Sequence, residues 1–437
     1  MKMKSKINII LVLISITGIC NTYAQRGEWV NQVIVVNSGK FESGPNYQDY
    51  VTVQAYDPVL KTVKVFDTIY TQSAQDVVID GHFAYVAAQD SIIKYDIDNY
   101  QRVAAIADSG MANLCLYNNK LIVSKQYPIK RFFVEVLDET LSLVHFVEGI
   151  SGDCGGISAD GNSIYVAVNH GWLGTEGRLA VISTDTWTLT KEINFGADAV
   201  GICNLYNYDG GIFSINKTPL GHESIGSLTV YNISSGYYSN KTLDYLVGDG
   251  AGIDNNLLYL KINEGIGSYN LDTQTIVDPA IVPDPGSASR IYILSARVDY
   301  LNNRLYLNIG TRLVNGFGVI TSLTGDSITS FPEGISADCI AIDYRTPVGI
   351  QVKGTIEMSF SLWPNPVDDL LSVKFNGSVL SSRELSVIDL TGRIIYEKRF
   401  INGEKSLTIS CENFPAGIYF ISLKTDNGIT TKKFFKK

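Results

Sequence analysis

Carboxylate and amide side chains recur along this 437-residue chain, each just before or at the start of an apolar run. The set comprises Gln75, Asp76, Asn113, Asp153, Asp198, Asp249 and Asp338. If the runs are equivalent strands around one axis, these side chains form a ring that could hydrogen-bond a polar ligand or hold a cation through its carboxylates. The alternative is that they bond neighbouring backbone amides and fix the start of each strand. The sequence leaves both interpretations open.

Aromatic, amide and basic residues gather in longer segments between the other apolar runs. These candidate ligand contacts are Asn37, Phe41, Tyr47, Tyr127, His170, Trp172 and Arg312. Ring faces can stack on a large, flat ligand while amides fix its orientation, which predicts a binding rim. The alternative is that these loops only cover the surface.

Catalytic motifs are mostly absent. The four histidines make neither His-x-x-x-His nor His-Glu-x-x-His, and there is no Gly-x-Ser-x-Gly or phosphate-binding glycine loop. His170 and His222 fall in comparable loops of neighbouring repeats and could meet as a pair, but no third ligand accompanies them. We therefore expect no enzyme activity, no bound metal and no cofactor.

Four cysteines occupy similar places in different repeats: Cys115, Cys154, Cys203 and Cys339. They could form disulfides or a metal ring, or they could be small buried hydrophobic residues. Because they lie more than about thirty residues apart without any Cys-x-x-Cys, zinc is disfavoured.

The elements that would position these residues are short strands. Within 153–189, period-two apolar runs alternate with turns at Asp160-Gly161-Asn162 and Thr184-Asp185-Thr186. Such a pattern is typical of antiparallel hairpins, and four strands in fewer than about fifty residues make one propeller blade.

The unit recurs. The turn between its first two strands reappears at Asp80-Gly81, Asn118-Asn119, Asp209-Gly210-Gly211, Asn255-Asn256 and Asn302-Asn303. The turns are roughly 38 to 49 residues apart, which predicts six complete blades between residues 75 and 334.

The two ends of this region supply a seventh blade. Residues 338–343 resemble a first strand without the rest of a blade, and 33–36, 50–56 and 62–67 resemble the other three strands. Joined, they would close the ring and remove its open sheet edges. The prediction is an all-β, seven-bladed β-propeller, with six or eight blades as alternatives.

The amino terminus reads as a signal peptide, residues 1–24. Lys2, Lys4 and Lys6 precede a short apolar run at 7–16 and a small-residue cleavage site. Cys20 raises lipoprotein processing as an alternative, but Ile19 before it is unfavourable, so plain secretion is expected.

Charge excludes one class of partner. Residues 25–354 contain 21 Lys and Arg against 35 Asp and Glu. Nucleic-acid binding needs a basic surface, so we expect none.

The pattern changes after the propeller region, 25–347. Residues 348–358 read as a linker, and 359–437 as a small immunoglobulin-like β-sandwich. This last part contains Pro364-Asn365-Pro366, the series Asp389-x-x-Gly392-Arg393, Pro415-Ala416-Gly417-Ile418-Tyr419 and a basic end. These motifs resemble the C-terminal sorting domain of the type IX secretion system.

That resemblance implies a Bacteroidetes-type bacterium and passage through the periplasm. It implies the type IX secretion machinery as a partner and a location outside the outer membrane, secreted or at the cell surface. The sorting domain of this family is usually removed, like the signal peptide. A sorting domain does not indicate what the propeller binds.

The propeller region is similar, more loosely, to the YncE-like surface propellers of Bacteroidetes, which include cobalamin-capturing proteins that partner outer-membrane transporters. The likeness rests on Asn37-x-Gly39-x-Phe41 followed by Ser43-Gly44. It implies capture of a corrinoid-like or other large polar metabolite, with a glycan second and an outer-membrane transporter as a candidate partner.

Three hypotheses follow. The first is a non-enzymatic surface protein that captures a small-molecule or glycan ligand at the funnel mouth. The second is a protein-interaction scaffold at the outer membrane. The third is a metal-dependent propeller lactonase or lyase.

Overall fold

The computed structural model of this chain describes residues 28–40, 49–171, 174–218, 226–346, 359–376, 383–390, 393–400, 406–425 and 428–437. Its strands divide into two compact units, Met1–Thr346 and Pro347–Lys437. The predicted signal peptide and linker lie outside the described residues, as do Phe41, Tyr47, Trp172 and His222. Apart from two 3-10 turns, η2 (Ala197–Ala199) and η3 (Ser287–Ser289), the described elements are all β-strands.

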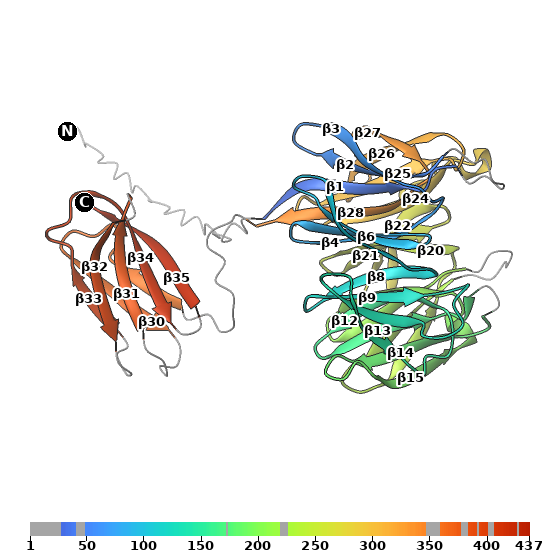
Figure 1. The fold of residues 1–437 in the computed structure, drawn as a ribbon, viewed down its shortest axis with the longest axis horizontal. Coiled ribbons are helices and arrows are strands. Elements are labelled where there is room, and N and C mark those ends of the chain that lie inside the picture. The colour runs from blue at the N-terminus through green and yellow to red at the C-terminus, as the bar shows by residue number, and fades with distance from the viewer. Residues whose placement is uncertain are drawn as a thin grey trace, which may run out of the picture. The chain divides into compact units, whose positions relative to one another are not determined.

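The first unit contains seven four-stranded antiparallel sheets within its described residues (Figure 1). Six of them use four consecutive strands, innermost first. They are β4 (Ala74–Asp80), β5 (Phe83–Ala88), β6 (Ser91–Asp96) and β7 (Gln101–Ala107); β8 (Met111–Tyr117), β9 (Lys120–Lys125), β10 (Val134–Asp138) and β11 (Leu143–Val147); β12 (Cys154–Asp160), β13 (Ser163–Val168), β14 (Gly177–Ser183) and β15 (Leu189–Gly196); β16 (Ile202–Tyr208), β17 (Gly211–Asn216), β18 (Ser227–Asn232) and β19 (Tyr238–Thr242); β20 (Val247–Asp254), β21 (Leu257–Ile262), β22 (Gly265–Asn270) and β23 (Thr275–Val282); β24 (Tyr292–Asp299), β25 (Arg304–Gly310), β26 (Asn315–Ser322) and β27 (Ser327–Ile335).

The seventh sheet joins both ends of the unit. Its order is β28 (Ala337–Arg345), β1 (Trp29–Asn37), β2 (Val51–Asp57) and β3 (Thr62–Ile69). In its register Val33 pairs with Ile342 and Val35 with Ile340. The prediction that strands from the two ends share one sheet is confirmed, and we call this the closing sheet.

Local backbone preference makes the repeated hairpins. At the turn between the first and second strands, Gly81, Asn119, Gly161, Asn255 and Asn303 all have positive φ, between 51° and 59°. Glycine and asparagine tolerate this left-handed conformation, which matches the twist of the flanking strands. The sequence turns at these places are therefore hairpin turns, as predicted.

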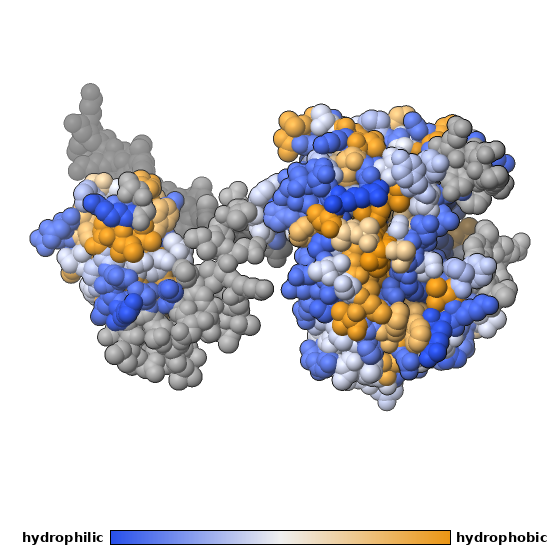
Figure 2. All heavy atoms as spheres, in the orientation of Figure 1, coloured by the Kyte–Doolittle hydropathy of each residue, from blue (hydrophilic) through white to orange (hydrophobic). Residues whose placement is uncertain are grey.

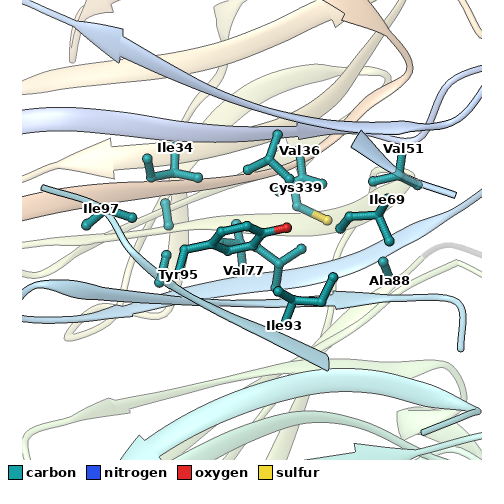
Figure 3. Packing of buried hydrophobic residues seen from close by; sticks show 14 of the residues in the cluster. Ile34, Val36, Val51, Ile69, Val77, Ala88, Ile93, Tyr95, Ile97 and Cys339 are labelled. Atoms are coloured by element: carbon teal, nitrogen blue, oxygen red, sulfur yellow. The ribbon is translucent and has the colours of Figure 1, made fainter. Parts of the chain in front are cut away.

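Each pair of neighbouring sheets encloses its own apolar cluster, and the series closes on itself. One cluster packs the closing sheet against the sheet β4–β7, through Ile34, Val36, Val77 and Tyr95 among others (Figure 3). Another packs the closing sheet against β24–β27, with Tyr56 stacked on Phe331 at 4.0 Å between ring centroids. Each buried valine or isoleucine contributes about 1.5–3 kcal/mol, so the clusters hold the sheets in a ring.

The predicted cysteine positions are confirmed. Cys115, Cys154, Cys203 and Cys339 lie on the innermost strands β8, β12, β16 and β28, and their thiols are free. Burial raises the pKa of each thiol, so these side chains behave as small hydrophobic residues.

The second unit has two antiparallel sheets around one core. The sheets are β29 (Ser359–Trp363), β30 (Leu370–Asn376) and β33 (Ser406–Ser410), and β32 (Ile394–Phe400), β31 (Arg383–Asp389), β34 (Gly417–Thr425) and β35 (Gly428–Lys436). Phe360, Val387, Ile421 and Phe434 are buried between them.

Candidate functional site

A cavity of ≈ 440 Å³ lies at the centre of the first unit, lined by residues of all seven innermost strands. The order of apolar and polar residues alone does not explain how so many side chains reach it. Every innermost strand carries an irregularity in its register near its start, for example between Ala74 and Asp76 and between Ile293 and Ser295. A β-bulge re-aims the side chains beside it, so this repeated feature turns polar residues toward the cavity.

Five of the predicted ring residues line this cavity: Gln75, Asp76, Asn113, Asp249 and Asp338. Asp76 accepts hydrogen bonds from the backbone amide of Leu114 at 2.9 Å and from Asn113 Nδ2 at 3.3 Å. Burial raises the pKa of the Asp76 carboxyl, and these donors with the nearby Arg297 charge offset only part of the rise.

The other two carboxylates are also bound by the protein. Asp338 accepts a 2.6 Å hydrogen bond from Ser38 Oγ and lies 3.4 Å from the Arg312 guanidinium. Asp249 accepts a 3.0 Å bond from Lys217 Nζ. Burial alone would raise the pKa of Asp249, but the positive charges of Lys217 and Lys261 lower it.

Two cationic side chains in the same cavity have no carboxylate partner among the described residues. Lys261, on β21, reaches only the carbonyl oxygen of Leu294, at 3.4 Å from Nζ. Arg297, on β24, donates from Nε to the carbonyl oxygen of Ile340 at 3.2 Å. Asp249 and Asp338 thus have ion-pair partners and Asp76 has amide donors, whereas Lys261 and Arg297 form no ion pair within the described chain.

The remaining sequence candidates lie elsewhere. Asn37 is buried in the closing sheet, where Thr52, Gln54 and the amide of Gly334 use its side chain, so the structure does not place it at a binding surface.

Asp153 and Asp198 do not line the cavity. The Asp153 carbonyl accepts the amides of Asn169 and His170, and Asp198 lies exposed in η2. In the fourth sheet Asn204 lines the cavity instead, because the strand β16 begins after the predicted position.

The rim candidates are separated. His170 lies against Gly152 with its Nε2 3.5 Å from Ser151 Oγ, Tyr127 is largely exposed, and Arg312 reaches Asp338. Phe41, Tyr47 and Trp172 are outside the described residues, so the structure does not locate the aromatic part of the rim.

Sequence reasoning missed Asn204, Tyr206, Lys261 and Arg297. One signal was available for Lys261, since the equivalent residue of two other second strands is Ala87 or Ala167. A charged residue at a position where neighbouring repeats have a small apolar one marks a departure from the repeat.

The described residues contain no group of three or more His, Cys, Asp or Glu side chains placed to hold a metal ion. Nor does the described part of the chain include a helix with the length and hydrophobicity needed to cross a membrane.

Comparison with known proteins identifies the second unit. Residues 361–437 match the secretion system C-terminal sorting domain. This domain directs the chain through type IX secretion to the cell surface or the extracellular space, and it implies interaction with that machinery. Curated proteins yield no match to the chain.

Solved structures resemble the fold of the first unit. A hypothetical selenium-binding protein from Sulfolobus tokodaii is 9% identical, with a TM-score of 0.51 over 72% of this chain and 92% of its own. Hydrazine synthase from Kuenenia stuttgartiensis is 13% identical, with a TM-score of 0.48 over 59% and 88%. The Pan2 WD40 domain from Neurospora crassa is 12% identical, with a TM-score of 0.44 over 63% and 80%. At such identities the likeness concerns the propeller-like fold alone.

Proposed function

We propose that this chain is a non-enzymatic binding protein of the cell surface or extracellular space, which captures a ligand at the mouth of its central cavity. The ring of seven four-stranded sheets is taken as a seven-bladed, YncE-like propeller, and the second unit as an immunoglobulin-like sandwich. The favoured ligand is a corrinoid-like or other large polar metabolite, with a glycan second.

The observation that carries this proposal is the convergence of polar side chains from different sheets on one cavity. Its volume of ≈ 440 Å³ is within the range of small-molecule sites, about 300–1,000 Å³. A ligand of corrinoid size would place one of its groups in the cavity and rest its larger part on the surrounding loops.

Calorimetric titration of the full chain with cobinamide, cobalamin and a set of oligosaccharides tests the proposal. We expect one-to-one binding that weakens about tenfold in Arg312→Ala, because this exposed guanidinium lies beside Asp338 at the rim. Arg399→Ala is the matched control, an exposed arginine of the sorting domain that should leave binding unchanged. Absence of binding to all these ligands would reject capture of these classes.

One observation favours a protein-interaction scaffold as the second candidate. Large apolar side chains are exposed on outermost strands of three consecutive sheets: Val65 on β3, Val103 on β7 and Leu143 on β11. Apolar patches are also visible within the polar surface in Figure 2. If this candidate is correct, the chain co-purifies with a partner and binds none of the titrated ligands.

A further inference from the structure

One wall of the cavity differs from the rest, and it is built from β16, β20 and β24 and the neighbouring strand β21. We call Tyr206, Lys261 and Arg297 the cationic wall. All three line the cavity, and they come from three different sheets. They face one cavity because the sequential sheets of the ring bring strands about fifty residues apart side by side.

Glycine in β20 makes the room for this wall. A Cβ atom at Gly250 would overlap the hydroxyl of Tyr206, and one at Gly248 would come within 2.9 Å of Lys261 Cβ. The side chains of Tyr206 and Lys261 therefore occupy space that a side chain at position 250 or 248 would fill. The arrangement depends on this particular strand, since the repeat does not require glycine at these two places.

The hydrogen-bonding capacity of the wall is largely unused among the described residues. Arg297 has one backbone acceptor for its five N–H donors, and Lys261 has one weak backbone acceptor. Neither cation forms an ion pair among the described residues, because Asp249 and Asp338 contact Lys217 and Arg312 instead. Asp249 and Asp76 are nevertheless near enough for the charges of Lys261 and Arg297 to act on them.

Resting on the proposed capture function, we propose that the cationic wall binds an anionic group of the ligand, a carboxylate or a phosphate, between Arg297 and Lys261. A guanidinium and an ammonium suit such oxygens, because the planar fork can donate two parallel bonds while the ammonium adds a point charge. The Tyr206 hydroxyl would donate a third bond.

Inorganic phosphate and succinate, titrated calorimetrically into the full chain at fixed ionic strength, test the proposal. We expect one-to-one binding, weakened at least about tenfold in both Arg297→Gln and Lys261→Gln. Lys241→Gln is the matched control, since it removes an exposed lysine of the outermost strand β19 that does not line the cavity, and it should bind as the parent does. Melting temperature shows whether each variant is folded.

A crystal soaked in bromide gives a second measurement that needs no variant. An anomalous peak between Arg297 and Lys261 supports the proposal, and a cavity without one contradicts it. Failure of phosphate and succinate to bind the parent chain up to about 10 mM also overturns it.

The same variants separate this inference from the function on which it rests. If cobinamide or an oligosaccharide binds equally well to the parent and to both variants, capture stands and the anionic contact is wrong. If phosphate binds and is lost in the variants while those ligands do not bind, the cationic wall is supported and the ligand class is a smaller anion.

Discussion

Two groups of charged residues in the ring have opposite arrangements. Where the closing sheet meets β4–β7, Arg345 contacts Asp343 and Asp98, and His82 contacts Asp98 and Arg345. We call these four residues the closing cluster. In the cationic wall, by contrast, Lys261 and Arg297 reach only backbone carbonyls.

The charges of the closing cluster stabilise the fold, whereas those of the cationic wall remain available to bind a ligand. Asp343 is fully buried and accepts bonds from Asn31, Gln32 and Arg345, all at 2.5–3.1 Å. Burying a carboxylate is tolerated only with such partners, and the partners here join residues more than 300 positions apart. A cation without a partner but open to a cavity can instead be matched by a ligand.

The largest effect is expected from Asp343→Ala in the closing cluster. It removes the carboxylate that pairs with the largely buried Arg345 and accepts from the Asn31 and Gln32 amides, so the free energy of unfolding should fall by about 3–5 kcal/mol. Urea denaturation measures this loss. Phosphate affinity should remain that of the parent, because Asp343 is not among the residues that line the cavity.

Asp185→Ala is the matched control for this variant, since its carboxylate is exposed in a hairpin turn and should cost little. Equal stability of the two variants would show that the closing cluster does not hold the ring together. A loss of phosphate affinity in Asp343→Ala alone would show that the two regions are coupled.

The second effect concerns a buried glutamate that has no hydrogen-bond partner among the described residues and does not line the central cavity. Glu333 on β27 is 4% exposed, and its carboxyl oxygens have no hydrogen-bond partner among the described residues. Burial raises its pKa to about 9 from an ordinary 4.5. The folded state therefore holds a proton that the unfolded state releases between these values, and stability falls as the pH rises through this window.

Glu333→Gln removes that titration. Relative to the parent, the variant should gain about 2–3 kcal/mol of unfolding free energy between pH 5 and pH 7, at about 1.4 kcal/mol for each pH unit. Urea denaturation at the two pH values measures the gain. Glu148→Gln, an exposed glutamate paired with Arg131, should show no such difference. A parent chain whose stability does not fall over this range would mean that Glu333 finds a partner in solution.

Much of the fold could be predicted because the residue types at each turn are enough to identify that turn. Gly81, Asn119 and Asn303 are residue types that accept positive φ, and alternating runs beside them give strands of period two. The closing sheet was also predictable, because residues 338–343 and 33–36 were each an incomplete part of the same pattern. The number of four-stranded sheets in the first unit follows from this pairing.

The candidate site could be predicted only in part. Asp76 and Asp249 stand out at the starts of strands, but the sequence does not show that Leu114 and Lys217 already satisfy them. Lys261 was harder to identify, since it belongs to a second strand and reaches the cavity only because Gly248 beside it lacks a side chain. Which charged side chains can bind a ligand depends on hydrogen-bond partners that are distant in the chain, and the sequence does not show them.

The smallest expected effect is an increase in phosphate affinity, the opposite of the loss expected for the cationic-wall variants. The carboxylate of Asp249 opposes anion binding at the cationic wall, because it lowers the positive potential that Lys217 and Lys261 create. Asp249→Asn removes that charge and leaves Lys217 unpaired. Phosphate affinity should therefore increase about fivefold, equivalent to about 1 kcal/mol, when measured by calorimetry at low salt.

Asp244→Asn is the control for net charge, since it removes an exposed carboxylate outside the cavity lining. If it raises phosphate affinity as much as Asp249→Asn does, the effect is a general one of an acidic protein. If Asp249→Asn instead weakens binding, its carboxylate contacts the ligand, and the ring acids would regain the role that the sequence first suggested. An increase in Asp249→Asn alone, lost again when Arg297→Gln is added, would locate the anion at the cationic wall, because only a charge near the bound group can act through it.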